Sequence, residues 1–149
     1  ALAWMEGHIF LRLQGTAAAI RSAHAQIGGE ATAGSTQFWE TVREQTHPFF
    51  TRSEPLWRLS LPPAATFNMP ENDVFMDWGG GLRWWHTDKP AAEIGALASE
   101  HGGYAYLFRA AAPVVGATPA ASLLAIHQHL KKSFDPQRIF NPGSMGGGF

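Results

Sequence analysis

The sequence predicts an α+β fold, a ferredoxin-like sandwich of the split βαβ type in which helices pack on one face of an antiparallel sheet. Two patterns indicate this class: short runs that alternate apolar and polar residues, and longer runs with apolar residues at helical spacing. The third indication is their order of strand, helix, strand, strand, helix, strand, with an extra leading strand, an extra helix, a closing helix and an aperiodic tail. The 149 residues, 45% of them hydrophobic, are enough for one folded core.

The N-terminal part predicts a hairpin followed by a helix. Residues 1–5 and 8–14 are extended runs separated by a turn at Gly7, where glycine permits the positive φ of a tight hairpin. Thr16 is a typical helix N-cap, and apolar residues then recur at helical spacing until Gly28 ends the run. Because the chain begins inside a strand and without a methionine, we expect it to be a fragment of a longer protein.

The middle of the chain predicts one more helix and three more strands. Helical spacing over residues 35–46 stops at Pro48, which cannot continue a helix. Alternation over residues 56–61 predicts a strand. Residues 74–78 and 82–86 flank three glycines and predict a second hairpin.

The last third predicts a helix, a strand and a closing helix. The first helix starts near residues 87–90 and ends at Gly102, and residues 104–109 follow as a strand. The dipeptide Thr118-Pro119 is the clearest helix start in the chain, and the apolar stripe that follows it extends to Ser133.

The composition excludes several classes of protein. A net charge of −1 provides no basic footprint, so we expect no nucleic acid as a partner. Without cysteine the chain has no disulfide, no thiolate and no cysteine-ligated iron–sulfur cluster. No apolar run is long enough to span a bilayer and no signal peptide is recognisable, so the chain is expected to be soluble and cytoplasmic.

The residues that commonly carry catalysis form no recognisable pattern. His127 and His129 are two positions apart on a predicted helix and point away from each other, so we expect no metal site. No nucleophile elbow, no acid–base pair of carboxylates and no phosphate-binding glycine motif is present. The chain alone is therefore not expected to be a catalyst.

The densest group of polar and aromatic residues lies in the second hairpin. On a strand over 82–86, Arg83 and Trp85 project from one face, and Trp84 and His86 project from the other. An arginine flanked by an aromatic ring suits a small carboxylate or a planar partner.

A structural interpretation of Arg83 stays open beside this one. Arg83 could form a cross-strand ion pair with Asp77, on the other arm of the hairpin. Arg58, on the neighbouring predicted strand, raises the same choice between an ion pair and a ligand.

The C-terminal tail, residues 134–149, has no period but a specific composition. Two prolines and an Asn-Pro-Gly corner fix turns, while Phe134 and Phe140 need burial. The segment therefore folds against another surface, which could be its own domain or a missing one. We divide the chain into a domain of residues 1–133 and this tail.

Several separated stretches resemble one family of flavoproteins. The tail looks like the C-terminal signature of FAD-linked oxidases of the vanillyl-alcohol oxidase type, and the further stretches are together similar to the FAD-binding subunit of bacterial glycolate oxidase. The resemblance covers nearly the whole chain but only the C-terminal half of the family. The stretches are Leu130–Pro136, Ile139–Gly143, Asp77–Trp84, Phe38-Trp39 with Pro48–Phe50, and Leu56–Pro62.

The resemblance implies a cap domain of an oxidoreductase that converts glycolate or a related 2-hydroxy acid. In such proteins a preceding flavin domain holds FAD, this region covers the isoalloxazine side, and the tail returns to the flavin domain. The implied partners are that flavin domain, a second flavin subunit and an iron–sulfur subunit, which could place the protein at the inner face of the membrane. This chain alone would neither hold FAD tightly nor turn over substrate.

The resemblance also suggests roles for particular residues. Arg83, and with less support Arg58, would anchor the substrate carboxylate, with Trp85 beside Arg83. His86 could accept the hydroxyl proton, but strand parity places it opposite Arg83.

In the tail, Asn141, Pro142 and Gly143 match the family and are candidate cofactor-side residues. Ser144 stands where the family usually has arginine, so that charged contact cannot be carried over. The alternative function is a non-catalytic structural or assembly module inside an oxidoreductase complex.

Overall fold

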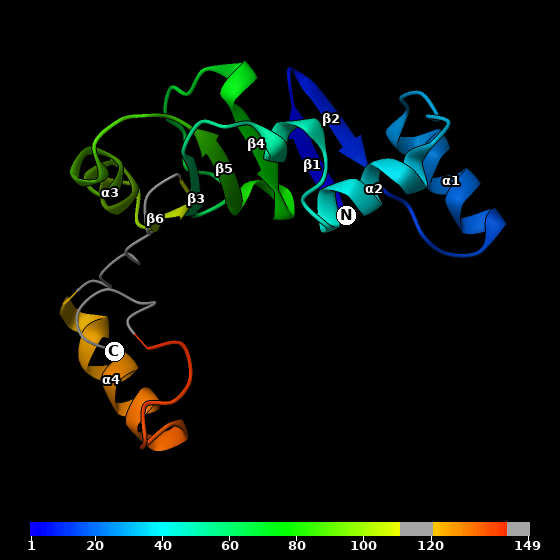
Figure 1. Ribbon diagram of the computed structural model, residues 1–149. Helices are drawn as coiled ribbons and strands as arrows, with labels where there is room; N and C mark the ends of the chain where they lie inside the picture. Colours follow the sequence, from blue (N-terminus) through cyan, green and yellow to red (C-terminus); the bar gives the residue numbers. More distant parts are fainter. Residues whose placement is uncertain (111–120, 143–149) are drawn as a thin grey trace.

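The computed structural model describes residues 1–110 and 121–142 (Figure 1). Within these residues the strands form one six-stranded antiparallel sheet in the order β2-β1-β4-β5-β3-β6, which confirms the α+β class. The strands are β1 (Leu2–Met5), β2 (His8–Leu11), β3 (Leu56–Ser60), β4 (Val74–Asp77), β5 (Leu82–His86) and β6 (Tyr104–Arg109). The helices are α1 (Ala17–Ile27), α2 (Ser35–Arg43), α3 (Ala91–Glu100) and α4 (Ala121–Phe134), with short 3₁₀ turns η1 (Pro48–Thr51), η2 (Glu71–Asp73) and η3 (Trp78–Gly80).

Four of the strands have the connectivity of the split βαβ motif. The order β4-β5-β3-β6 is that of a ferredoxin-like sheet, and α3 connects β5 to β6. The connection from β3 to β4 contains only the short turn η2 in place of a helix. Pro62, Pro63 and Pro70 lie in this connection and disfavour a helix there. The two predicted helices before β3 thus lie outside the motif.

The N-terminal hairpin extends the sheet beyond β4. Glu6 and Gly7 have φ of 49° and 76°, the left-handed pair that a two-residue hairpin turn requires, and β1 pairs with both β2 and β4. Thr16 caps α1 as predicted, with its hydroxyl accepting the Ala19 N–H at 3.3 Å. No residue of α1 is buried, so this helix contributes little to the core.

The core lies on both faces of the sheet. Trp84 packs on one face with Phe50 of η1 and Val42 of α2, whereas Trp85 packs on the other face with Ile94 of α3. Helices therefore cover both faces, whereas the sequence placed them on one. The reason is that β3 and β5 carry apolar side chains at successive positions, so each face needs a cover.

The last helix and the tail present apolar side chains to solvent. In Figure 1, α4 lies apart from the sheet, and Phe134 at its end is 84% exposed. The predicted helix start at Thr118-Pro119 lies outside the described residues, as do Gly143 and Ser144. The exposed large hydrophobic residues of this segment are Leu123, Ile126, Leu130, Phe134, Ile139 and Phe140.

Candidate functional site

Strand β5 presents its side chains as the sequence predicts. Trp85 lies directly opposite Trp57 of β3, and Trp84 lies opposite Arg58. Arg83 and Trp85 therefore share one face of the sheet. Arg58 lies on the other face, with Trp84 and His86.

Arg83 is enclosed by its own domain. Its side chain is 3% exposed, its Nε donates to the carbonyl of Gly80 at 3.2 Å, and its Nη2 donates to the carbonyl of Ala65. The Phe67 ring lies 5.2 Å from its Cζ. Burial lowers the pKa of Arg83, because water no longer solvates the cation. The guanidinium thus holds the β3–β4 connection against β5.

The alternative ion pair between Arg83 and Asp77 is wrong. Met76 lies opposite Arg83, and Asp77 lies opposite Leu82, so the carboxylate and the guanidinium are on different faces of the sheet. Asp77 instead accepts the backbone N–H of Trp78 at 2.7 Å. Trp85, predicted beside Arg83, is buried in the core with Trp57 and Ile94.

Arg58 is held by aromatic rings. Its Cζ lies 5.7 Å from the ring centre of Trp78, 5.8 Å from Trp84 and 5.6 Å from Tyr106. The side chain is half-buried, and within the described part of the chain its guanidinium has neither a hydrogen bond nor an ion pair. Its donor groups are therefore free to receive an anion, while the rings fix its orientation.

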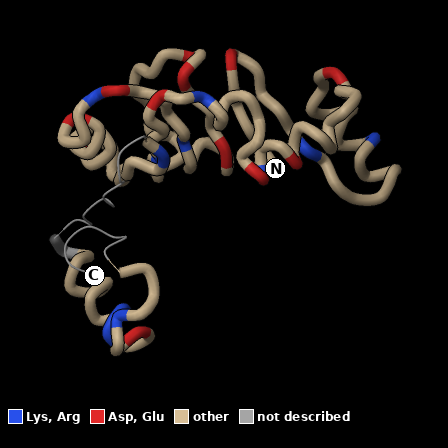
Figure 2. The backbone as a smooth tube through the Cα atoms, in the orientation of Figure 1, with Lys and Arg blue, Asp and Glu red and all other residues tan. Residues whose placement is uncertain are grey.

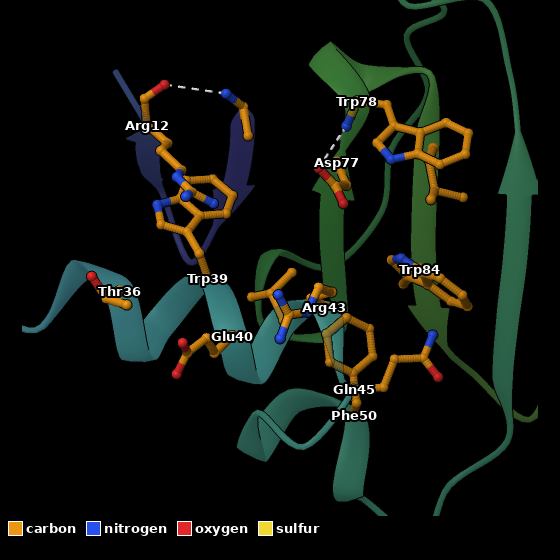
Figure 3. A pocket seen from close by; sticks show the side chains of 13 residues that line it. Arg12, Thr36, Trp39, Glu40, Arg43, Gln45, Phe50, Asp77, Trp78 and Trp84 are labelled. Atoms are coloured by element: carbon orange, nitrogen blue, oxygen red, sulfur yellow. Dashed lines mark hydrogen bonds between the residues drawn. The ribbon is translucent and has the colours of Figure 1, made fainter. Parts of the chain in front are cut away.

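A cavity of about 500 Å³ opens beside this cluster (Figure 3). Trp39 of α2 forms one side, and Trp78 and Trp84 form the other. Its charged lining is mixed, with Arg12 and Glu40 among the contributors. The sequence did not indicate that α2 would face the second hairpin, because no local pattern reports which elements meet across a sheet.

His86 lies on the Arg58 face but does not reach the cavity. The ring is buried, with Nδ1 3.1 Å from the carbonyl oxygen of Glu54 and Nε2 2.7 Å from that of Phe49. Both nitrogens are thus engaged by backbone carbonyls of η1 and of the segment that follows it. This placement suits a structural role and leaves no nitrogen directed at a bound acid.

The tail forms a loop closed by one carboxylate. Asp135 accepts the N–H groups of Ile139 at 2.9 Å and Phe140 at 3.0 Å, and Lys131 Nζ donates to it at 2.6 Å. Lys131 Nζ also donates a hydrogen bond to the carbonyl oxygen of Phe140, 2.5 Å away. The Lys131 hydrogen bond, helped by the two N–H groups, holds the pKa of Asp135 below its usual range. Asn141 follows with φ of 45° and is exposed.

The distribution of charged residues and of potential metal ligands can be stated for the described residues. Figure 2 shows basic and acidic residues interspersed along the strands and helices. Within residues 1–110 and 121–142, no three potential metal ligands come together, and no helix has the length and apolar character needed to cross a bilayer.

Comparison with known proteins identifies a relative for almost the whole chain. The glycolate oxidase subunit GlcE of Escherichia coli strain K12 is 38% identical over 148 residues. The predicted resemblance is confirmed. The match covers 97% of this chain and 40% of GlcE, so the chain spans less than half the length of its relative. No family model matches the chain, and no solved structure matches it.

Proposed function

We propose that this chain forms the substrate-side cap of a glycolate oxidase subunit, which at full length takes part in oxidising glycolate to glyoxylate. The similarity to GlcE supports the reaction. The free, ring-bound guanidinium of Arg58 supports the binding of a small 2-hydroxy acid and is the observation that carries the proposal.

Arg58 is a better candidate for the carboxylate anchor than Arg83. A planar carboxylate pairs well with two parallel N–H donors, and the Arg58 fork has its donors available among the described residues. Arg83 already donates from two nitrogens to backbone carbonyls and is almost completely buried. Substrate contact by Arg83 or Trp85 would require the β3–β4 connection to move, so we rank both below Arg58.

Neither Gly80 nor Gly28 forms a cradle for the pyrophosphate of FAD. A Cβ on Gly80 would lie 3.1 Å from the carbonyl oxygen of Pro63, so the η3 turn packs against its own chain rather than forming an open cradle. Gly28 lies at the C-terminal end of α1, the negative end of the helix dipole. We propose that a flavin domain outside this chain holds FAD, with Asn141, Pro142 and Gly143 facing it.

The partners proposed for the intact protein are a second flavin subunit and an iron–sulfur subunit, through which it would reach the inner face of the membrane. The name of the relative supports a complex, since GlcE is described as a subunit. The exposed apolar residues of α4 and the tail favour a second candidate function, an assembly module without a catalytic role. Both candidates predict that residues 134–149 contact the flavin domain.

Kinetics of arginine variants test the proposed function. The natural-length protein, co-purified with its partner subunits, is assayed for glycolate-dependent reduction of a dye, with wild type compared to R58A and R58K. Loss of a charge-assisted hydrogen bond of about 1.5–3 kcal/mol predicts a rise in KM of about 10-fold to 150-fold in R58A. R58K retains the charge without the planar fork and is expected to lie between the two.

The assembly function predicts a different result. If Arg58 does not touch substrate, R58A and wild type have the same KM, and the protein affects turnover only through the amount of complex recovered. Size-exclusion chromatography of each preparation measures that amount. An unchanged KM with intact complex would remove Arg58 from the substrate site.

A further inference from the structure

Trp78 borders both the Arg58 cluster and the cavity. Its ring centre is 5.7 Å from the Arg58 Cζ, and the same side chain lines the cavity that Trp39 closes from the other side (Figure 3). Trp84 also contacts Arg58 and lines the cavity, but it is buried in the core. Trp78 is 70% exposed, so it is the member of this wall that can be altered without opening the core.

The backbone of Trp78 is held in an unfavourable conformation. Its φ is 51°, in the left-handed region, which costs a non-glycine residue about 1–2 kcal/mol. The Asp77 carboxylate fixes it by accepting the Trp78 N–H at 2.7 Å, and Gly79 and Gly80 continue the turn with φ of 64° and 92°. A side chain this exposed gains little from core packing, so core stability does not explain why the turn presents tryptophan.

We propose that Trp78 is a positioning and specificity-determining residue of the Arg58 site. One part of the indole holds the Arg58 guanidinium in a fixed orientation for a carboxylate. The same indole lines the cavity of about 500 Å³ together with Trp84, whereas Arg58 is not part of the lining, so the two rings stand between the guanidinium and that space. The site therefore takes a small 2-hydroxy acid and rejects one with a bulky side chain. This inference rests on the proposed function, because it assumes that Arg58 binds the substrate carboxylate.

Removal of the indole has two opposite consequences. The Arg58 guanidinium loses one of its three rings, so a small acid binds less well. The wall between Arg58 and the cavity is reduced to Trp84, so an aromatic side chain can extend past it toward Trp39. A merely structural defect would lower kcat/KM for the small and the bulky acid by the same factor. The ratio of the two kcat/KM values is therefore the informative measurement.

The test uses the natural-length protein with its partner subunits and two substrates, glycolate and 3-phenyllactate. For W78A we expect KM for glycolate to rise about fivefold to tenfold, as loss of one cation–π contact implies, with kcat within about twofold. We expect the kcat/KM ratio of 3-phenyllactate to glycolate to rise at least about tenfold, the usual scale of discrimination by pocket size. W78F retains a ring and should restore the KM for glycolate.

Ile9→Ala is the matched control, because Ile9 is also a strongly exposed apolar residue but lies on β2, outside the cavity lining. This control variant should have wild-type kcat and KM values for both substrates. Equal losses for both substrates in W78A, or no change in either, would overturn the inference while glycolate oxidation by wild type persists. Absence of glycolate oxidation in wild type, or an R58A protein with unchanged KM, would instead refute the proposed function, and this inference with it.

Discussion

Two arginines on adjacent strands show how burial assigns different roles to the same residue type. Arg58 of β3 and Arg83 of β5 lie on opposite faces of the sheet. Arg83 donates from two nitrogens to backbone carbonyls, whereas Arg58 contacts three rings and has no hydrogen bond in the part of the chain that is described. Arg83 is therefore an internal brace for the proline-rich β3–β4 connection, and Arg58 is a cation available to a ligand.

The two roles predict opposite effects of the same substitution. Arg83→Met would leave the carbonyls of Ala65 and Gly80 without donors, so we expect a loss of about 1–3 kcal/mol in the free energy of unfolding. Arg58→Met removes no hydrogen bond between described residues and should cost less than about 1 kcal/mol, while glycolate binding weakens as in R58A. Urea denaturation of both variants measures the difference. Equal stability losses would contradict the assignment of Arg83 as the brace.

For single residues, the sequence predicts which face of the sheet a side chain occupies, but it does not predict which residues of other segments lie beside it. Alternation along β5 is a local property, so it correctly separates Arg83 and Trp85 from Trp84 and His86. The ring cluster around Arg58 combines β3, β6 and the η3 turn, and only the order of strands in the sheet brings these together. No spacing within any one of these segments reports that order.

Among the elements, the C-terminal loop has a testable dependence on pH. The pKa of Asp135 is lowered in the folded state, so its stabilisation is complete above the ordinary aspartate value of about 3.9 and is lost as pH falls below it through the lower folded value. Protonation removes the negative charge and turns one of the two accepting oxygens into a hydroxyl, so the hydrogen bonds from the Ile139 and Phe140 N–H groups weaken. We therefore expect these two amides to exchange hydrogen faster in Asp135→Asn at neutral pH, as NMR can measure.

Lys132→Ala provides the control for this loop. Lys132 is exposed and adjacent to Lys131, and Lys131 is the residue that donates to Asp135. The control should leave the exchange of both amides unchanged. Equal protection in Asp135→Asn and wild type would show that the loop does not depend on the Asp135 carboxylate.

The elements themselves were predictable where their signals are local. The glycine turn at Gly7, the Thr16 cap and the end of α3 before Gly102 all appear where the sequence indicates them. The placement of helices on both faces was not predictable in the same way. It depends on α2 and η1 crossing back over the Trp84 face, and on Pro62 and its neighbours preventing a helix after β3.

For the whole molecule, the main consideration is how much of its relative the chain represents. It spans 40% of GlcE and exposes a row of apolar residues on α4 and the tail. Exposed apolar patches of this kind commonly mark contacts with another domain or subunit. The sequence suggested the need for such a contact through the two aromatic residues of the tail, whereas it predicted no partner for the apolar stripe of α4.

Limited proteolysis tests whether the missing length covers this surface. Trypsin cleaves after Lys132 and Arg138, which are exposed beside the apolar row. If a flavin domain packs on the row, these bonds should be cut at least about tenfold more slowly in a protein of GlcE's length than in this 149-residue chain, because cleavage requires local opening of about 1.4 kcal/mol or more.

Ile126→Asp places a charge in the contact and should restore fast cleavage. Gln128→Asp adds the same charge at an exposed position of α4 outside the apolar row, so it should leave cleavage slow. Equally fast cleavage in the long and short proteins would mean that the apolar row faces solvent or a separate subunit, and the return of the tail to the flavin domain would then be wrong.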